Sequence, residues 1–318
     1  MTEPLDEEAE RERPRLGRAA PVRVRVPAKI NLHLRVGDLR SDGFHELSTV
    51  YHAVSLYDEI TARSGDTLTL TMEGEGTGHL PLDESNLAIR AARLLAEHTG
   101  RPPYARLHLR KSIPIAGGLA GGSADAAAAL VACDALWNTG LTRDHLADLA
   151  ADIGSDVPFL VLGGTALGTG RGERVSPVLA PGHTWHWVLA FADDGLSTPE
   201  VYAEIDRRRA NGIADAVAGE ADLLLAALRQ RDPEVLAATL VNDLQAPALA
   251  LRPELMRTLM AADDVDALAG VISGSGPTCV FLAADSRHAA AIAASLERSG
   301  VCRSTATVTG PVPGARVV

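Results

Sequence analysis

Lysine is almost absent from this 318-residue chain, since 28 of its 30 basic residues are arginine and only Lys29 and Lys111 are lysine. On an exposed surface arginine serves as well as lysine, but a planar guanidinium fork cannot replace a compact ammonium in a tight site. The two lysines are therefore candidate functional residues. The alternative is that each is an ordinary surface residue that remains by chance.

Cysteine, long apolar runs and excess positive charge are also lacking. The three cysteines (Cys133, Cys279 and Cys302) contain no C-x-x-C pair, which argues against a disulfide framework or a thiolate metal site and predicts a reducing, cytoplasmic compartment. No apolar run reaches the roughly 18 residues of a membrane span, and the N-terminus has no secretory signal. A net charge of −11 argues against nucleic acid or an anionic membrane as a partner.

The length and the pattern of the chain predict two domains of the α+β class. At roughly 100–200 residues per domain, the chain is long enough for two. Strand-like segments dominate its first half and clustered helices its second. A stretch with Pro177, Pro181 and Gly182 marks the boundary, which gives a disordered tail (1–20), an N-terminal domain (21–178) and a C-terminal domain (179–312).

Hydrophobic periodicity and capping residues predict most of the individual elements. Alternating or apolar runs predict strands at 22–26, 30–36, 67–72, 105–110, 185–192 and 301–308. The first two of these are separated by a turn at 27–29. Apolar spacing with capping residues predicts helices at 86–99, 123–137, 142–153 and 286–300, and others between 199 and 262. Residues 271–283 predict a strand, a tight glycine turn and a second strand.

The strongest motif is IPIAGGLAGGSADAAAAL, residues 113–130, in which four glycines lead into a helix opened by Ser123. Glycine lets the backbone approach a ligand closely, and a helix start offers unpaired N–H groups and partial positive charge. Together they predict a site for a di- or triphosphate. The segment lacks the G-K-[ST] of P-loop proteins and the G-x-G-x-x-G of dinucleotide folds, so the mechanisms of those classes do not apply.

Three further segments supply candidate side chains. Lys29 and Asn31 share one face of a strand and could enter one cleft, although Lys29 could instead be a surface residue at a turn. Asp156 either faces that cleft or caps the next helix, which has Pro158 in its first turn. Residues 273–278 (SGSGPT) form either a hairpin turn or a second wall of the phosphate site.

Taken in chain order, five motifs resemble the GHMP kinase superfamily, over residues 22–310 or so. They are PAKINL (27–32), SDGFHEL (41–47), PIAGGLAGGSADAAA (114–128), SDVPFL (155–160) and GSGPT (274–278). The resemblance implies phosphoryl transfer from ATP, with Mg²⁺, to the hydroxyl of a small molecule. It also implies a ribosomal-protein-like N-terminal domain and a ferredoxin-like C-terminal domain.

Within the superfamily, SDGFHEL after PAKINL is similar to members of the non-mevalonate isoprenoid pathway. These members phosphorylate the 2-hydroxyl of a cytidine diphosphate-linked methylerythritol. Two alternatives stay open. The chain could be another GHMP kinase, acting on mevalonate, homoserine or a sugar, or a non-catalytic nucleotide-binding module.

The resemblance also implies a role for individual residues. Lys29 and Asp156 match the catalytic pair. The implied ATP site consists of Asn86, Lys111, Pro114, Ile115, Ala116, Gly117, Gly118, Leu119, Ala120, Gly121, Gly122, Ser123 and Ala124. The implied substrate site consists of Asn31, Phe44, His45, Tyr202, Gly274 and Ser275, with Phe44 and Tyr202 stacking on the cytosine base.

The chain departs from the family pattern at two of these positions. Phe44 stands where a tyrosine is usual, which keeps the ring for stacking but loses a phenol hydrogen bond. Ala120 stands where a glycine is common, and we therefore expect an ordinary negative φ there. No set of metal ligands is visible, and Ser123 is a candidate ligand only by its position.

Overall fold

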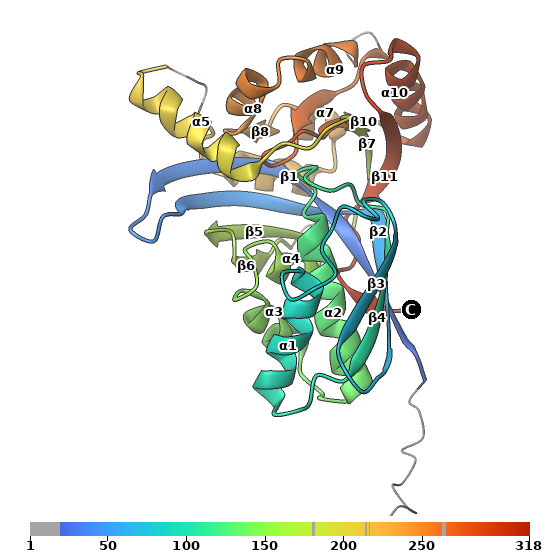
Figure 1. The fold of residues 1–318 in the computed structure, drawn as a ribbon. Coiled ribbons are helices and arrows are strands. Elements are labelled where there is room, and N and C mark those ends of the chain that lie inside the picture. The colour runs from blue at the N-terminus through green and yellow to red at the C-terminus, as the bar shows by residue number, and fades with distance from the viewer. Residues whose placement is uncertain (1–19, 180–181, 214, 216, 263–264) are drawn as a thin grey trace, which may run out of the picture.

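The computed structural model describes residues 20–318 except 180–181, 214, 216 and 263–264. The tail expected at residues 1–20 therefore lies outside the described residues, apart from Ala20, which is exposed. The described chain forms two sheets with helices packed against them (Figure 1). Mostly antiparallel sheets with helices packed against them confirm the predicted α+β class.

The first sheet contains eight strands, five of which follow the order β12-β1-β2-β4-β3. Of the other three, β8 pairs with β1, β5 pairs with β2, and β6 pairs with β5. Its strands are β1 (Val22–Leu39), β2 (His45–Ser64), β3 (Thr69–Gly74), β4 (Ala105–Lys111), β5 (Thr165–Gly170), β6 (Arg174–Pro177), β8 (Val241–Asn242) and β12 (Arg316–Val317). Four helices gather below β1 and β2 in Figure 1. They are α1 (Leu87–Thr99), α2 (Gly121–Trp137), α3 (Arg143–Ala150) and α4 (Val157–Leu162).

The second sheet contains four strands in the order β11-β7-β10-β9. Its strands are β7 (Trp185–Phe191), β9 (Ala269–Ile272), β10 (Cys279–Ala283) and β11 (Ser304–Gly310). The helices of this half are α5 (Thr198–Ala210), α6 (Asp222–Gln230), α7 (Pro233–Ala237), α8 (Gln245–Leu251), α9 (Leu255–Ala261) and α10 (Ser286–Ser299). In Figure 1, α5, α8, α9 and α10 lie above β1, on the side opposite α1–α4.

The second half of the chain contributes two strands to the first sheet. β6 of the first sheet ends at Pro177 and β7 of the second sheet begins at Trp185. However, β8 and β12 return from the second half of the sequence to pair with β1. The long strand β1 therefore contacts both halves, and it is the strand that carries Lys29.

The prediction of two short strands separated by a turn at 27–29 is wrong, because β1 is continuous from Val22 to Leu39. Its register against β2 shifts between Pro27 and Ala28, and again at two later points. A bulge absorbs a proline that cannot donate to the ladder, so the strand passes through the predicted turn. The 20-residue partner strand β2 was not predicted, since buried polar residues such as His52 and Asp58 interrupt its apolar pattern.

The predicted helices are present with corrected ends. α1 is capped by the Asn86 side chain, which accepts from Ala88 N, and it ends at a left-handed Gly100, as predicted. α3 starts after the Thr142 cap but ends at Ala150, before the predicted end at residue 153. α2 begins at Gly121, ahead of the predicted Ser123, so the last two glycines of the motif belong to the helix.

Helix α2 fixes the glycine-rich segment relative to β1. Its residues from Ala124 to Cys133 are all buried, which is typical of a helix enclosed on every side. It contacts α1, α4, β1 and β2. In addition, the amide of Lys29 donates to the carbonyl of Leu119 at 3.3 Å. The helix start and the first candidate lysine are thus held in one rigid arrangement.

Candidate active site

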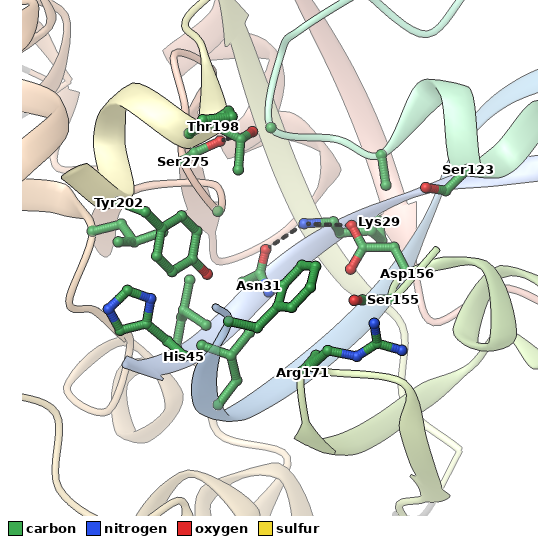
Figure 2. Close-up of a pocket in the computed structure, with 18 of the residues that line it drawn as sticks. Lys29, Asn31, His45, Ser123, Ser155, Asp156, Arg171, Thr198, Tyr202 and Ser275 are labelled. Carbon is green, nitrogen blue, oxygen red and sulfur yellow. Dashed lines mark hydrogen bonds and ion pairs between the residues drawn. The ribbon is translucent and has the colours of Figure 1, made fainter. Parts of the chain in front are cut away.

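A cavity of about 770 Å³ lies between β1, the start of α2 and helix α5. Figure 2 shows Tyr202 and His45 at one end, Lys29 and Asp156 in the middle, and Ser123 toward the other end. The cavity is lined by most of the predicted site residues. These are Lys29, Asn31, Phe44, His45, Ala116, Gly117, Gly118, Ala120, Gly121, Gly122, Ser123, Asp156, Tyr202, Gly274 and Ser275.

Lys29 and Asn31 share the inner face of β1, as the strand period predicts. Lys29 Nζ donates to Asn31 Oδ1 at 2.7 Å, and the amide nitrogen of Asn31 donates to Thr49 Oγ1 at 2.8 Å. The lysine side chain is only 7% exposed. The reading of Lys29 as a surface residue at a turn is therefore wrong.

Asp156 completes this group from the start of α4. Its Oδ2 lies 3.6 Å from Lys29 Nζ, and its Oδ1 accepts from the Tyr51 hydroxyl at 2.9 Å. The side chain makes no capping hydrogen bond to α4, which instead begins with Pro158 in its first turn. Asp156 therefore occupies the N-cap position that the alternative expected, but its carboxylate does not cap the helix and lines the cavity instead.

Tyr51 is a site residue that the sequence did not indicate. It lies in the middle of the unpredicted strand β2, and its ring stacks on Phe159 of α4 with centroids 4.9 Å apart. Burial, together with the neighbouring Asp156 charge, raises the pKa of Tyr51 well above its usual value. The phenol therefore stays protonated and can only donate to Asp156, which fixes the orientation of the carboxylate.

The glycine-rich segment bends around one end of the cavity. Gly118 has φ +74°, and a Cβ there would collide with the carbonyl oxygen of Ser273. Ala116 and Ala120 also have positive φ values, +49° and +58°. The expectation of an ordinary φ at Ala120 is thus wrong, and two alanines hold the left-handed conformation that glycine favours. Gly121 then opens the 17-residue helix α2 toward the cavity.

Some members of the predicted ATP segment do not face this cavity. Leu119 and Ala124 are fully buried in the core. Pro114 and Ile115 line a neighbouring hollow of about 700 Å³ instead. Ala116 and Gly117 line both spaces, so the segment separates the two.

Lys111 and Asn86, predicted beside the nucleotide, do not line the cavity either. Lys111 Nζ donates to Asp58 at 2.7 Å and to Asp125 at 2.9 Å, and its side chain is 1% exposed. Burial alone would lower the pKa of Lys111, but the Asp125 and Asp58 carboxylates outweigh it and raise the pKa. Asn86 is occupied as the cap of α1. Both residues support the site from behind.

The 273–278 loop connects the antiparallel strands β9 and β10, as the hairpin interpretation predicts, and two of its residues also line the cavity. Ser273 Oγ donates to the carbonyl of Gly118 at 3.1 Å. Asn242 anchors the loop by donating to the carbonyls of Ile272 and Gly274, each at 2.7 Å. Gly274 and Ser275 consequently lie beside the glycine-rich segment and Lys29.

The aromatic end of the cavity contains Phe44, His45 and Tyr202. The Tyr202 and His45 rings lie 5.2 Å apart, tilted by 30°. Phe44 is half exposed, and the Arg171 guanidinium lies 5.0 Å from its ring centroid. Arg171 and Asp206 also line the cavity, and neither was predicted, because no recognised motif includes them.

Two kinds of feature are absent from the described residues. None of the helices placed by the structure is long and apolar enough to cross a membrane. Within the same residues, no three His, Cys, Asp or Glu side chains gather as they would around a metal ion.

The fold is that of a class of phosphotransferases. The chain matches the GHMP kinases N terminal domain over residues 86–164 and the GHMP kinases C terminal domain over residues 224–302. The chain belongs to the GHMP kinase family, and it is a kinase that uses ATP. The two-domain fold and the kinase activity implied by the sequence motifs are confirmed.

Similar proteins within this family share one name. The 4-diphosphocytidyl-2-C-methyl-D-erythritol kinase of Salinispora tropica is 70% identical over 301 residues, which cover 95% of this chain and 96% of that protein. The protein of the same name from Mycobacterium tuberculosis is 56% identical over 297 residues and covers 93% of each chain.

Solved structures show the same resemblance. A crystal structure of 4-(cytidine 5'-diphospho)-2C-methyl-D-erythritol kinase is 33% identical, with a TM-score of 0.72, covering 90% of this chain and 98% of that one. A homoserine kinase from Cytophaga hutchinsonii has a TM-score of 0.74 at 18% identity, covering 94% and 97%. The second likeness is one of fold alone.

Proposed function

We propose that this chain transfers the γ-phosphoryl group of ATP to the 2-hydroxyl of 4-diphosphocytidyl-2-C-methyl-D-erythritol, in the non-mevalonate route to isoprenoid precursors. The observation that carries this proposal is the order of groups along one cavity. The Lys29–Asp156 pair lies between a glycine-lined end and an aromatic end. The names of relatives at 56% and 70% identity support the choice of substrate. Because both substrates are small and water-soluble, the proposal includes a cytoplasmic location.

The Lys29–Asp156 pair is proposed to act at the acceptor hydroxyl. The hydroxyl oxygen bonds to the γ-phosphorus, the bond to the β-phosphate oxygen breaks, and ADP leaves. Asp156 accepts the hydroxyl proton, and the Lys29 ammonium stabilises negative charge on the attacking oxygen. The 3.6 Å separation of the pair is longer than a close ion pair, which leaves both groups free to contact that oxygen.

The glycine-lined end is proposed to bind the phosphates of ATP. Backbone N–H groups at the start of α2 and its partial positive charge favour a polyphosphate there. Mg²⁺ usually binds through phosphate oxygens and one or two protein ligands. The Ser123 hydroxyl lines the same cavity and fits such an ion, which would neutralise phosphate charge when bound.

The aromatic end is proposed to bind the cytidine diphosphate portion of the substrate. Phe44 and Tyr202 each offer a ring to the base, and such stacking contacts contribute about 1–3 kcal/mol each. His45 offers a hydrogen bond to the edge of the base. Arg171, close to both Phe44 and Asp156, is suited to the diphosphate, since a guanidinium binds phosphate oxygens in pairs.

A substrate panel with coupled detection of ADP release tests the proposal. The cytidine diphosphate substrate should be turned over with a kcat/KM at least about 1,000-fold above that of the same alcohol without cytidine, because remote binding energy is used at the reacting centre. Preferred turnover of mevalonate, homoserine or a sugar would assign the chain to another GHMP kinase activity. ATP binding without turnover of any panel member would favour a non-catalytic module.

A further inference from the structure

Asp206 contacts the base-binding end of the cavity, although the mechanism above gives it no task. It lies on α5 one helical turn after Tyr202, so the two side chains share a face of the helix. Its Oδ1 is 2.9 Å from His45 Nε2. The His45 side chain is 6% exposed, whereas that of Asp206 is 45% exposed. The partly exposed Asp206 carboxylate therefore contacts the buried His45 ring.

This contact decides which nitrogen of His45 carries the proton. A carboxylate only accepts hydrogen bonds, so Nε2 must donate, and a neutral imidazole then has an unprotonated Nδ1. Within the described part of the chain, Nδ1 has no hydrogen-bond partner, and it is not among the side-chain atoms sealed from solvent. Because His45 lines the cavity, Nδ1 is available to a ligand as an acceptor.

We propose that Asp206 is a positioning residue that fixes His45 with its proton on Nε2 and thereby selects a base bearing an amino group. Cytosine presents an exocyclic amino donor at the position where uracil presents a carbonyl acceptor. An acceptor at Nδ1 pairs with the first and repels the second. This inference rests on the proposed function, since it concerns how the same site distinguishes cytidine from uridine substrates.

Rates with cytidine and uridine substrates test the proposal in Asp206→Asn and Asp206→Ala variants. For the cytidine substrate, kcat/KM should fall about 10- to 100-fold, mainly through KM, as expected for loss of a charge-assisted hydrogen bond. For the uridine substrate it should change less than about threefold, so discrimination narrows. Glu200→Gln is the matched control, because Glu200 is an exposed carboxylate of the same helix that does not line the cavity. It should leave both rates unchanged.

Ring ¹⁵N NMR of His45, assigned with a His45→Gln variant, supplies a readout independent of activity. The wild-type protein should show a protonated Nε2 and an unprotonated Nδ1, and Asp206→Ala should lose that preference. A protonated Nδ1 in the wild type, or unchanged discrimination in both Asp206 variants, would overturn the inference. Failure of the wild type to turn over the cytidine substrate would reject the proposed function instead, while the NMR result would still report on the tautomer.

Discussion

The two lysines of this chain occupy opposite kinds of environment, 82 positions apart in the sequence. Lys29 lines the cavity, and its carboxylate partner Asp156 is 3.6 Å away and 28% exposed. Lys111 is sealed behind the glycine-rich segment, 2.7 and 2.9 Å from two carboxylates that are at most 4% exposed. The loose, accessible pair suits chemistry, and the tight, enclosed cluster suits support of the loop.

The difference shows that the rarity of lysine in this chain indicates which positions matter, but not whether the role is chemical or structural. Asp58 of the Lys111 cluster also accepts from the amides of Ser112 and Ile113, at 2.6 and 2.8 Å. The cluster therefore joins Asp58 of β2, Lys111 at the end of β4 and Asp125 of α2. The glycine-rich segment lies between Lys111 and Asp125 in the sequence. Lys111 reaches two carboxylates from one compact ammonium, which explains a lysine here on structural grounds.

The largest expected effect is loss of stability on changing Lys111→Met. Two buried carboxylates would lose the cation that both contact, and breaking a buried ion pair from one side costs about 3–5 kcal/mol. Denaturant unfolding measures this free energy. The matched control is Lys29→Met, which should cost no more than about 1 kcal/mol because Asp156 remains partly solvated. Equal losses of unfolding free energy in the two variants would contradict the assignment of a structural role to Lys111 alone.

Lys29→Arg should lower kcat about 100- to 1,000-fold, the usual result of removing one charged donor from a developing oxyanion. A guanidinium retains the charge but cannot occupy the compact space between Asn31 and Asp156. Steady-state kinetics with saturating ATP measure the loss, and thermal unfolding should show a nearly unchanged midpoint. Near-normal kcat would mean that charge alone suffices at this position.

His52 is a third buried basic group, and among the described residues no charged side chain pairs with its ring. Its Nδ1 pairs with the Thr165 hydroxyl at 2.8 Å, and burial lowers the pKa of His52 from 6.5 to about 3. The unfolded chain therefore binds the proton more readily, and stability falls as pH drops from about 6.5 toward 3. The loss from this group is at most about 1.4 kcal/mol per pH unit.

Urea unfolding between pH 7 and pH 5 tests the role of His52. In a His52→Gln variant, the number of protons taken up on unfolding should fall by up to about one, which makes the unfolding free energy less dependent on pH. Burial also lowers the pKa of His33, and its contribution to the pH dependence should remain in the variant. An identical slope in the variant and the wild type would show that His52 does not titrate between the two states.

Ala120→Gly should have the smallest effect, a gain of about 0.5–1 kcal/mol in unfolding free energy. Relief of the left-handed alanine at φ +58° outweighs the greater freedom of glycine in the unfolded chain. The control is Ala128→Gly in the middle of α2, the helix that follows Ala120, and it should cost about 1 kcal/mol. Calorimetry compares the two, and a loss at Ala120 would show that the loop conformation is not strained.

Local patterns predicted the parts of the site that depend on neighbouring residues. The spacing of Lys29 and Asn31, the end of α1 at Gly100 and the glycines around the start of α2 all act within a few positions, and the structure places them as expected. Tyr51, the Asp58–Lys111–Asp125 cluster and Asp206 depend on contacts between distant strands and helices. The polar residues of β2 kept that strand from being predicted. Two residues of the strand were therefore missed: Tyr51, which contacts Asp156, and Asp58, which contacts Lys111.

The central claim is that Asp156 acts at the acceptor hydroxyl beside Lys29, and single-turnover phosphoryl transfer by Asp156→Asn tests it most directly. With ATP and the cytidine diphosphate substrate both bound, the transfer rate should fall about 100- to 10,000-fold, while ATP affinity stays within about threefold of wild type. A rate loss below tenfold would contradict the account and leave Asp156 as no more than an orienting contact.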